Sequence, residues 1–216
     1  GRPGGGHTGR MSGAGLRRER FDPSATGALR GVRVVDLSRL VAGNVLTKVL
    51  ADHGAEVVKV EGPSGDDTRT WGPPFVEGAD GENLSAAYYH STNRNKRSIA
   101  LDLKHPDGHA AFLELAKTAD VLVENMRVQV KHRLKIAYED LKEINPRLVY
   151  ASISGFGQTG PYSKRGGVDQ IAQGMGGLMS ITGEPGRGPM RVGIPIDDLT
   201  AGNLLALGVM MKLYDR

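Results

Sequence analysis

The chain has 216 residues, of which 39% are hydrophobic and 24% charged, so it is long and apolar enough for one well-buried domain or two small ones. It contains no cysteine, which excludes disulfide bonds and thiolate metal sites, and no apolar run of membrane-spanning length. Its net charge of +4 comes largely from the N-terminal tail, so the charge gives no reason to expect nucleic acid and suits a small polyanionic ligand equally well.

The N-terminal segment differs in composition from the rest of the chain. Residues 1–29 are rich in arginine and glycine, which predicts a disordered leader ahead of one domain at 30–216. The leader lacks the apolar core of a secretory signal, and its arginines only loosely resemble a mitochondrial transit peptide. We therefore expect a cytoplasmic protein, with a mitochondrial one as the alternative.

From residue 30 onward, short β-branched and apolar runs alternate with stretches of helical spacing. The apolar runs are nearly continuous, as in strands buried on both faces, and five are expected, at 31–38, 55–61, 97–103, 120–126 and 147–154. Helices are expected at 44–54, 105–119 and 138–145, and a turn-rich loop at 62–74. This alternation predicts an α/β fold: an open, doubly wound parallel sheet with helices on both faces and ligands at the carboxyl ends of its strands.

Two patterns resemble functional motifs without meeting their requirements. The stretch GFGQTG at 155–160 matches a dinucleotide-binding fingerprint, but Pro161 follows at once and the motif comes after the fifth strand rather than the first. We interpret it as a coincidence and keep a nicotinamide-dependent oxidoreductase only as a distant alternative. His105 and His109 lie four residues apart around Pro106 and Gly108, where a helix begins, so no metal site is expected.

Asp197 and Asp198 stand side by side just ahead of the apolar run LLALGVMM. An aspartate at this position caps a helix, because its oxygens accept hydrogen bonds from the first N–H groups and its charge suits the positive end of the helix dipole. Capping accounts for one carboxylate and leaves open whether the other takes part in chemistry.

Six stretches, taken together and in order, resemble the class III coenzyme A-transferases. These are LRGVRVVDLSRLVAGN, LADHGAEVVKVEGPSGDDTR, NRNKRSIALDLKHPDG, ADVLVENM, LKEINPRLVYASISGFGQTGPY and RVGIPIDDLTAGNLLALG. The resemblance covers residues 28–213 and implies the Rossmann-like large domain of that family, with acyl-CoA and a small carboxylic acid as partners and no cofactor besides CoA as substrate and carrier.

In such enzymes an aspartate attacks the acyl-CoA thioester, and a mixed anhydride is followed by an aspartyl-CoA thioester. The match to LTAG places this nucleophile at Asp198, with Asp197 as its cap or neighbour. A nucleophilic carboxylate must stay ionised, and a helix N-terminus favours the ionised form by only about 0.3–1 kcal/mol, so we expect Asp198 to be accessible rather than deeply buried.

The resemblance also implies where CoA binds and what the enzyme accepts. The CoA-binding residues it implies are Val41, Ala42, Leu101, Leu103, Lys104, Asn125, Met126 and Arg133. Lys104 and Arg133 are candidate phosphate partners. The loop GDDTRTWGPPF is most similar to succinyl-CoA–glutarate transferases, so Arg69 is a candidate for holding the distal carboxylate of a dicarboxylic acceptor.

The chain departs from the family pattern in two ways. After VEN the family has an aromatic residue and a Pro-Gly turn, whereas this chain has Met126 and no such turn. The sequence also stops near the middle of the family's length, without the small domain, although family members form interlocked homodimers. An inactive or CoA-binding-only fragment is therefore an alternative. An α-methylacyl-CoA racemase is disfavoured, because Val168 stands where its histidine is expected.

Overall fold

The computed structural model describes residues 26–216, so most of the predicted leader lies outside the described residues. Leu29, expected as the last residue of that leader, is buried in the hydrophobic core. Its amide donates a hydrogen bond to the carbonyl of His53 at 2.9 Å. The folded part of the chain therefore begins before Leu29.

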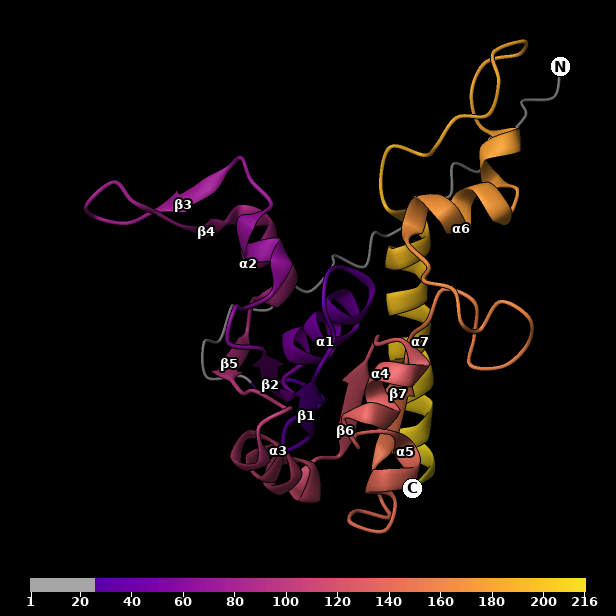
Figure 1. The fold of residues 1–216 in the computed structure, drawn as a ribbon. Coiled ribbons are helices and arrows are strands. Elements are labelled where there is room, and N and C mark those ends of the chain that lie inside the picture. Colours follow the sequence, from indigo (N-terminus) through magenta and orange to yellow (C-terminus); the bar gives the residue numbers. More distant parts are fainter. Residues whose placement is uncertain (1–25) are drawn as a thin grey trace, which may run out of the picture.

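Five strands form one parallel sheet in the order β5-β2-β1-β6-β7 (Figure 1). Their bounds are β1 (Arg33–Asp36), β2 (Glu56–Glu61), β5 (Lys96–Ala100), β6 (Val121–Glu124) and β7 (Val149–Ser152). This confirms the predicted α/β fold and all five predicted strands. Chain connections run outward in both directions from β1 and β6, so the switch point of the doubly wound sheet lies between these two strands.

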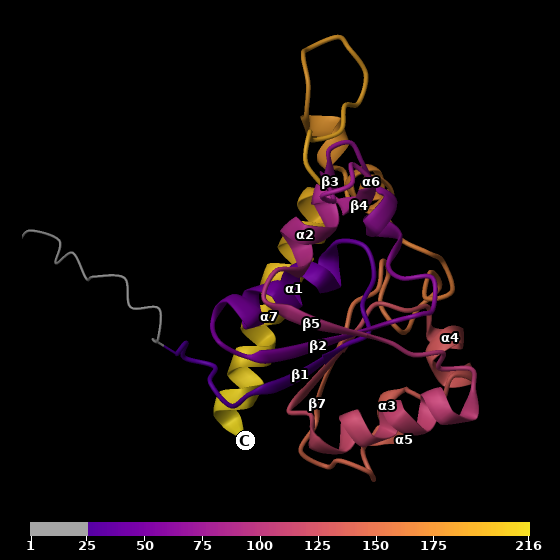
Figure 2. The same ribbon diagram turned by 90° about the vertical axis from the view of Figure 1, so that its left-hand side faces the viewer.

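Helices cover both faces of the sheet, as predicted (Figure 2). On one face α1 (Ala42–Asp52) and α7 (Ile196–Asp215) pack on the strands, and on the other face lie α3 (Pro106–Thr118) and α5 (Tyr138–Leu141). Each helix turns an apolar stripe inward, such as Leu46 and Leu50 of α1, because burial of these side chains is what holds the layers together. The short helix α4 (Val128–Arg133) follows β6.

Two arms were not predicted from the sequence. One contains the antiparallel hairpin β3 (Phe75–Glu77) and β4 (Asn83–Ala86), followed by α2 (Ala87–Asn93); the other contains α6 (Asp169–Met175) and the 3₁₀ turn η2 (Leu178–Ile181). Figure 1 shows them projecting away from the sheet. Their strands and helices are short and rich in exposed side chains, so they lack the long periodic pattern that makes an element recognisable in a sequence.

Helices α1 and α7 approach closely at Gly202. A Cβ atom at this position would lie 2.5 Å from the carbonyl oxygen of Ala42 and 3.3 Å from the Cβ of Val45. Only a residue without a side chain permits this approach. Since Asp198 stands one turn before Gly202 on the same helix, the contact with α1 also fixes where that carboxylate lies.

Candidate active site

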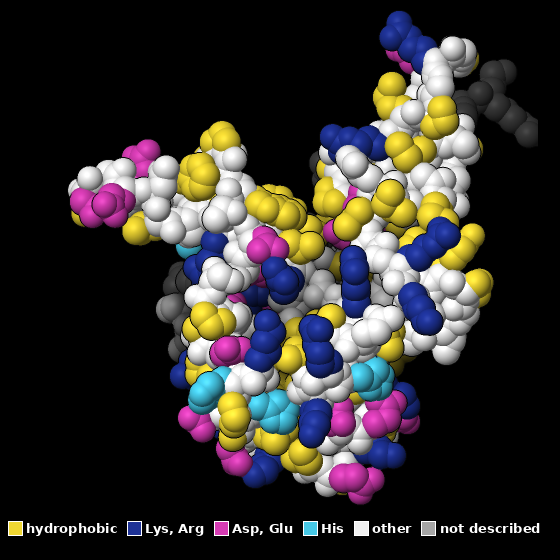
Figure 3. All heavy atoms as spheres, in the orientation of Figure 1, with side chains coloured by type: hydrophobic (Ala, Val, Ile, Leu, Met, Phe, Trp, Pro, Cys, Tyr) yellow, Lys and Arg dark blue, Asp and Glu magenta, His cyan; other side chains and the backbone are white. Residues whose placement is uncertain are grey.

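A cavity of about 670 Å³ lies at the carboxyl ends of the strands, where the fold class places ligands. It is lined by the segments that follow β1, β2, β5 and β6. Figure 3 shows Lys and Arg side chains around the hollow on this face of the molecule. A second hollow of about 540 Å³ adjoins the cavity and shares Leu103, Lys104 and Leu134 with it.

The structure brings together most of the residues predicted to bind CoA. The predicted residues that line the main cavity are Leu101, Leu103, Lys104, Asn125 and Met126. Arg133 lines the adjoining hollow together with His109 and Lys135. Val41 and Ala42 lie elsewhere: they are buried at the start of α1, against the crossing with α7.

The side-chain amide of Asn125 serves the protein rather than a ligand. Its Oδ1 accepts a hydrogen bond from the Arg39 amide at 2.9 Å, and its Nδ2 donates to the Arg39 carbonyl at 2.7 Å. Asn125 follows β6 and Arg39 follows β1, so the pair joins two walls of the cavity at the switch point of the sheet. Each polar atom of Asn125 thereby has one partner within the protein.

Several cations at the cavity and the adjoining hollow are free to meet a ligand. Within residues 26–216, no ion pair involves Lys104, Arg127, Arg133 or Lys135, although Arg39 pairs with Asp67 at the same cavity. Unpaired guanidinium and ammonium groups beside a hollow suit phosphate oxygens. Sequence reasoning missed Arg127. Its position directly after the strand predicted at 120–126, beyond the carboxyl end, could have identified it as a candidate.

Arg69, predicted to hold an acceptor carboxylate, already binds one within the protein. Its Nε and Nη2 donate to the two carboxylate oxygens of Glu61 at 2.8 and 2.7 Å. Its Nη2 also donates to the Tyr89 hydroxyl at 2.6 Å, and the guanidinium lies 3.8 Å from the centre of the Tyr89 ring. Arg69 therefore already has a carboxylate partner within the protein, and it does not line the cavity.

The acid pair at 197 and 198 lies in the first turn of α7, but neither residue caps the helix. Pro195 occupies the cap position, and the backbone amides of Asp197 and Asp198 donate to Oδ1 of Asp169 at 2.9 and 3.4 Å. The interpretation of Asp197 as the cap is therefore wrong. The carboxylate that caps α7 comes from α6, and residues 26–216 donate no hydrogen bond to the carboxylate of Asp198.

The environment of Asp198 disfavours its charge. Burial, and then the negative charges of Asp169 and Asp197, raise the pKa of the Asp198 carboxyl to about 6. The side chain is partly buried rather than freely accessible. The cost of burying the charge therefore outweighs the stabilisation of the ionised form that we expected from the helix N-terminus. A carboxylate of higher pKa is a better nucleophile once it is ionised, which suits acyl transfer near neutral pH.

Sequence reasoning also missed an aromatic residue near these acids and a second one packed against it. Burial, together with the charges of Asp198 and Asp169, raises the pKa of Tyr88, which places this α2 residue close to them. The ring of Trp71 lies 5.6 Å from that of Tyr88 and is partly exposed. These residues come from a turn-rich loop and a short helix, so only the tertiary structure brings them together.

The GFGQTG motif has no dinucleotide-binding context in the structure. The loop after β7 continues to residue 168, and the next helix begins at Asp169, so no helix N-terminus meets the motif. Gly155 instead packs against Gly167, where an added Cβ would lie 2.4 Å from the Gly167 Cα atom. The motif belongs to a loop that folds back on itself, which supports its interpretation as a coincidence.

The described part of the chain has two further properties. None of the helices between residues 26 and 216 combines the length and apolar character needed to cross a membrane. The same residues contain no group of three or more His, Asp or Glu side chains placed to hold a metal ion.

Comparisons with known proteins show the family of the chain. A family model described as CoA-transferase family III matches residues 29–216. The chain is 55% identical over 181 residues to a succinate–glutarate CoA-transferase of Agrobacterium fabrum, covering 83% of this chain and 45% of that protein. It is 46% identical over 207 residues to the human succinyl-CoA:glutarate CoA-transferase, covering 94% of this chain and 46% of that protein.

Solved structures show the same relationship. A CAIB/BAIF family protein from Brucella suis superposes with a TM-score of 0.85 at 45% identity, covering 89% of this chain and 50% of that one. A protein from Mycobacterium tuberculosis superposes with a TM-score of 0.79 at 33% identity, covering 88% of this chain and 52% of that one. The chain thus spans about half the length of the relatives that it matches.

Proposed function

This chain belongs to CoA-transferase family III, and we propose that it carries the CoA-binding and nucleophilic part of an enzyme that transfers CoA from an acyl-CoA to a carboxylic acid. A dicarboxylic acceptor is proposed because the relatives above are named as acting on succinyl-CoA or succinate and glutarate. Tyr88, and Trp71 packed against it, are then the proposed contacts for the acyl and acceptor chains.

In the proposed reaction the Asp198 carboxylate attacks the thioester carbonyl, the C–S bond breaks, and CoA leaves as a thiolate. The thiolate attacks the aspartyl carbonyl of the mixed anhydride and releases the donor acid, which leaves CoA on Asp198 as a thioester. The acceptor carboxylate then attacks this thioester, and the same steps in reverse release the new acyl-CoA. The thioester bond energy is retained throughout, which is the advantage of covalent catalysis here.

We place the CoA phosphates at the unpaired cations of the cavity and the adjoining hollow. Leu101, Leu103 and Met126 supply an apolar surface for the adenine. Val41 and Ala42 stand at the α1 end that meets Gly202, one turn from Asp198. A pantetheine arm that leaves the cavity past this end of α1 would bring its sulfur to the carboxylate.

The observation that carries the proposal is the state of Asp198: a partly buried carboxylate whose helix is capped by another acid and whose oxygens accept no hydrogen bond from residues 26–216. Incubation with an acyl-CoA followed by hydroxylamine should leave a hydroxamate on Asp198, located by peptide mass spectrometry. A control with CoA and the free acid should give none. A hydroxamate on Asp169 or Asp197 would contradict the assignment, and CoA binding without any adduct would favour the alternative of binding alone.

The exchange rate is expected to depend on pH through Asp198. Because the pKa of its carboxyl is raised to about 6, the protonated, non-nucleophilic form accumulates as the pH falls below that value. The rate should therefore rise with pH and level off above about pH 7, as expected roughly one unit above a titration midpoint. A rate that stays constant down to pH 4.5 would show that Asp198 does not titrate in the reacting enzyme.

Arg127 is expected to contribute to CoA binding. Loss of a charge-assisted hydrogen bond of about 1.5–3 kcal/mol predicts that Arg127→Ala weakens CoA binding at least about tenfold. Arg127→Lys should retain part of the affinity, since a lysine keeps the charge but not the bidentate geometry. Titration calorimetry checks this. The control is Arg187→Ala, which removes an exposed loop arginine paired with Glu184 and should leave the affinity unchanged.

A further inference from the structure

A lysine is buried where the hydrophobic core meets the cavity. Side chains of β2 alternate between the two faces of the sheet, so Val57, Lys59 and Glu61 share the face that α1 covers. Val57 belongs to the core, whereas Lys59 lies two residues closer to the cavity and has only 1% of its side chain exposed. A charged group so deeply buried must have every donor satisfied.

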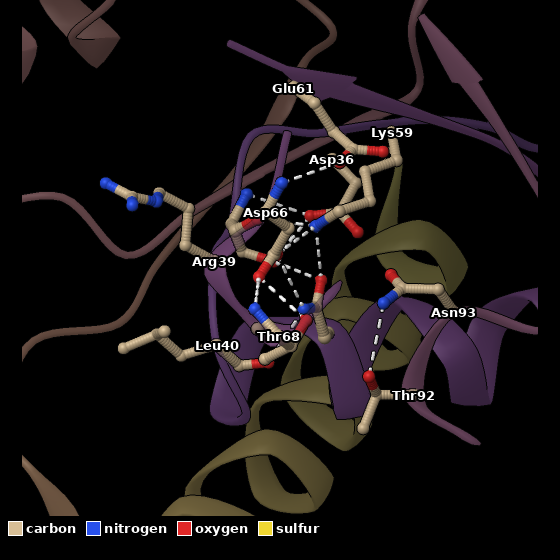
Figure 4. Close-up of polar contacts among 12 residues, drawn as sticks. Asp36, Arg39, Leu40, Lys59, Glu61, Asp66, Thr68, Thr92 and Asn93 are labelled. Carbon is tan, nitrogen blue, oxygen red and sulfur yellow. Dashed lines mark hydrogen bonds and ion pairs between the residues drawn. The ribbon is translucent and has the colours of Figure 1, made fainter. Parts of the chain in front are cut away.

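The ammonium of Lys59 has three acceptors for its three N–H bonds (Figure 4). It donates to the Ser38 carbonyl at 2.9 Å and to Oδ1 of Asn44 at 2.7 Å, and it pairs with Oδ2 of Asp66 at 2.9 Å. Ser38 lies in the loop after β1, Asn44 in α1, and Asp66 in the loop after β2. One side chain therefore ties three separate segments together.

The loops after β1 and β2 form walls of the cavity, and the loop after β1 contains a residue in an unfavourable backbone conformation. Leu40 lines the cavity and has a φ of 65°, which a branched side chain rarely adopts. Nδ2 of Asn44 holds it by donating to the Leu40 carbonyl at 2.7 Å. Because Oδ1 of Asn44 accepts from Lys59, the amide can face Leu40 only with its nitrogen.

The buried charges around Lys59 would still cancel if Lys59 and Asp66 were both absent. Asp36 pairs with Lys96 at 3.1 Å, and Lys59 pairs with Asp66, so the buried cluster consists of two neutral pairs. A buried ion pair contributes little net stability compared with apolar residues of similar volume. Stability alone therefore does not account for a lysine at position 59, whereas the orientation of the cavity walls does.

We propose that Lys59 is a positioning residue for CoA binding. Its ammonium sets the distance between the loop that joins β1 to α1 and the loop that joins β2 to η1 (Asp67–Thr70). Through Asn44 it also fixes the conformation of Leu40. The inference rests on the proposed binding of CoA in this cavity. Lys59 lies in the wall of the cavity, but its ammonium does not bind the ligand in this arrangement, because its three N–H bonds point to protein acceptors.

The test compares CoA affinity, by titration calorimetry, with melting temperature. Lys59→Met leaves Asp66 as an unpaired buried charge and is expected to melt well below the wild type. Lys59→Met/Asp66→Asn removes one charge of each sign, so its melting temperature should stay within about 3 °C of the wild type. The Ser38 carbonyl then loses its donor, and Oδ1 of Asn44 keeps only longer contacts, at 3.4 Å from the Ser38 hydroxyl and 3.5 Å from the Lys96 ammonium. The CoA affinity of the double variant should therefore fall at least about tenfold.

Two further variants separate positioning from stability. Asn44→Ala leaves the Lys59–Asp66 pair in place and should also weaken CoA binding about tenfold. Lys117→Met removes an exposed lysine of α3 and should change nothing. In the exchange assay the double variant should keep its kcat within about twofold while its KM for acyl-CoA rises about tenfold, because the α7 carboxylates are untouched.

The inference would be overturned if the double variant or Asn44→Ala folded and still bound CoA with the affinity of the wild type. So would a loss of kcat at unchanged KM, which would locate the effect at the reacting carboxylate. Absence of CoA binding by the wild-type protein would be a different result, because it would remove the proposed CoA site itself.

Discussion

Asp198→Asn is expected to abolish CoA exchange and, at the same time, to make the protein more stable. The amide has almost the same shape but cannot attack a thioester, so the covalent route is closed. It also removes a charge that burial and the neighbouring acids Asp169 and Asp197 disfavour. Few substitutions combine a complete loss of function with a gain in stability, and the combination is typical of a strained catalytic group.

The direction of the stability change follows from proton binding. The pKa of Asp198 is raised from 3.8 to about 6 on folding, so the unfolded chain releases its proton first as the pH rises. Folding stability is therefore lost between these two pH values and stays reduced at pH 7. Allowing for solvent screening and for the helix-end interaction that the amide loses, we expect a gain of about 1 kcal/mol, or about 2–4 °C in melting temperature.

Thermal melts at pH 7 and at pH 3.5 check this explanation. The difference between wild type and Asp198→Asn should disappear at the lower pH, where both side chains are neutral. Asp197→Asn is the matched control in the same helical turn: it should retain exchange, with its pH profile moved to lower pH because one of the charges that raise the Asp198 pKa is gone. Equal loss of exchange in both variants would contradict the assignment of Asp198 as nucleophile.

Gly202→Ala is expected to impair both stability and exchange. The added methyl group would lie 2.5 Å from the Ala42 carbonyl oxygen, so α1 and α7 must move apart. Overpacking of this kind destabilises by about 1–3 kcal/mol. Asp198 lies one turn away on the same helix, and a displacement of about 1 Å at a reacting group can reduce the rate about 100-fold.

Gly208→Ala provides the control within the same helix. A Cβ atom there meets only Leu205 Cδ1, at 3.9 Å, so it fits without any movement. Replacing glycine by alanine inside a helix should then stabilise by about 0.5–1 kcal/mol and leave exchange unchanged. Melting curves and exchange rates of the two variants should change in opposite directions. A stabilising Gly202→Ala would show that α1 and α7 do not meet as closely as this structure places them.

Much of the fold was predictable because the β-sheet and its helices are encoded locally. The strands are short β-branched runs buried on both faces, and α3 begins at Pro106 with a pattern of helical spacing, so their order along the chain already specifies a parallel, doubly wound sheet. The arm around β3 and β4 was missed because exposed, short strands carry no such periodicity.

The candidate site was only partly predictable. Its family and the position of Asp198 followed from stretches of sequence, since these are contiguous patterns. Lys104 was implied by the resemblance and lines the cavity just beyond β5, whereas Arg127, in the same situation after β6, was overlooked. The role of Arg69 toward an acceptor stays a prediction, and the sequence did not show that Glu61 faces its guanidinium.

By itself, the sequence determined the order of strands and helices, the edge of the sheet where a ligand cavity forms, and which aspartate is the candidate nucleophile. Only the tertiary structure decided that Asp169 caps α7, that Asn125 binds the Arg39 backbone, and that a buried Lys59 joins the cavity walls. The reason is physical: periodic burial is written into neighbouring residues, whereas these contacts join residues far apart in the chain, and their partners are set by how the layers pack.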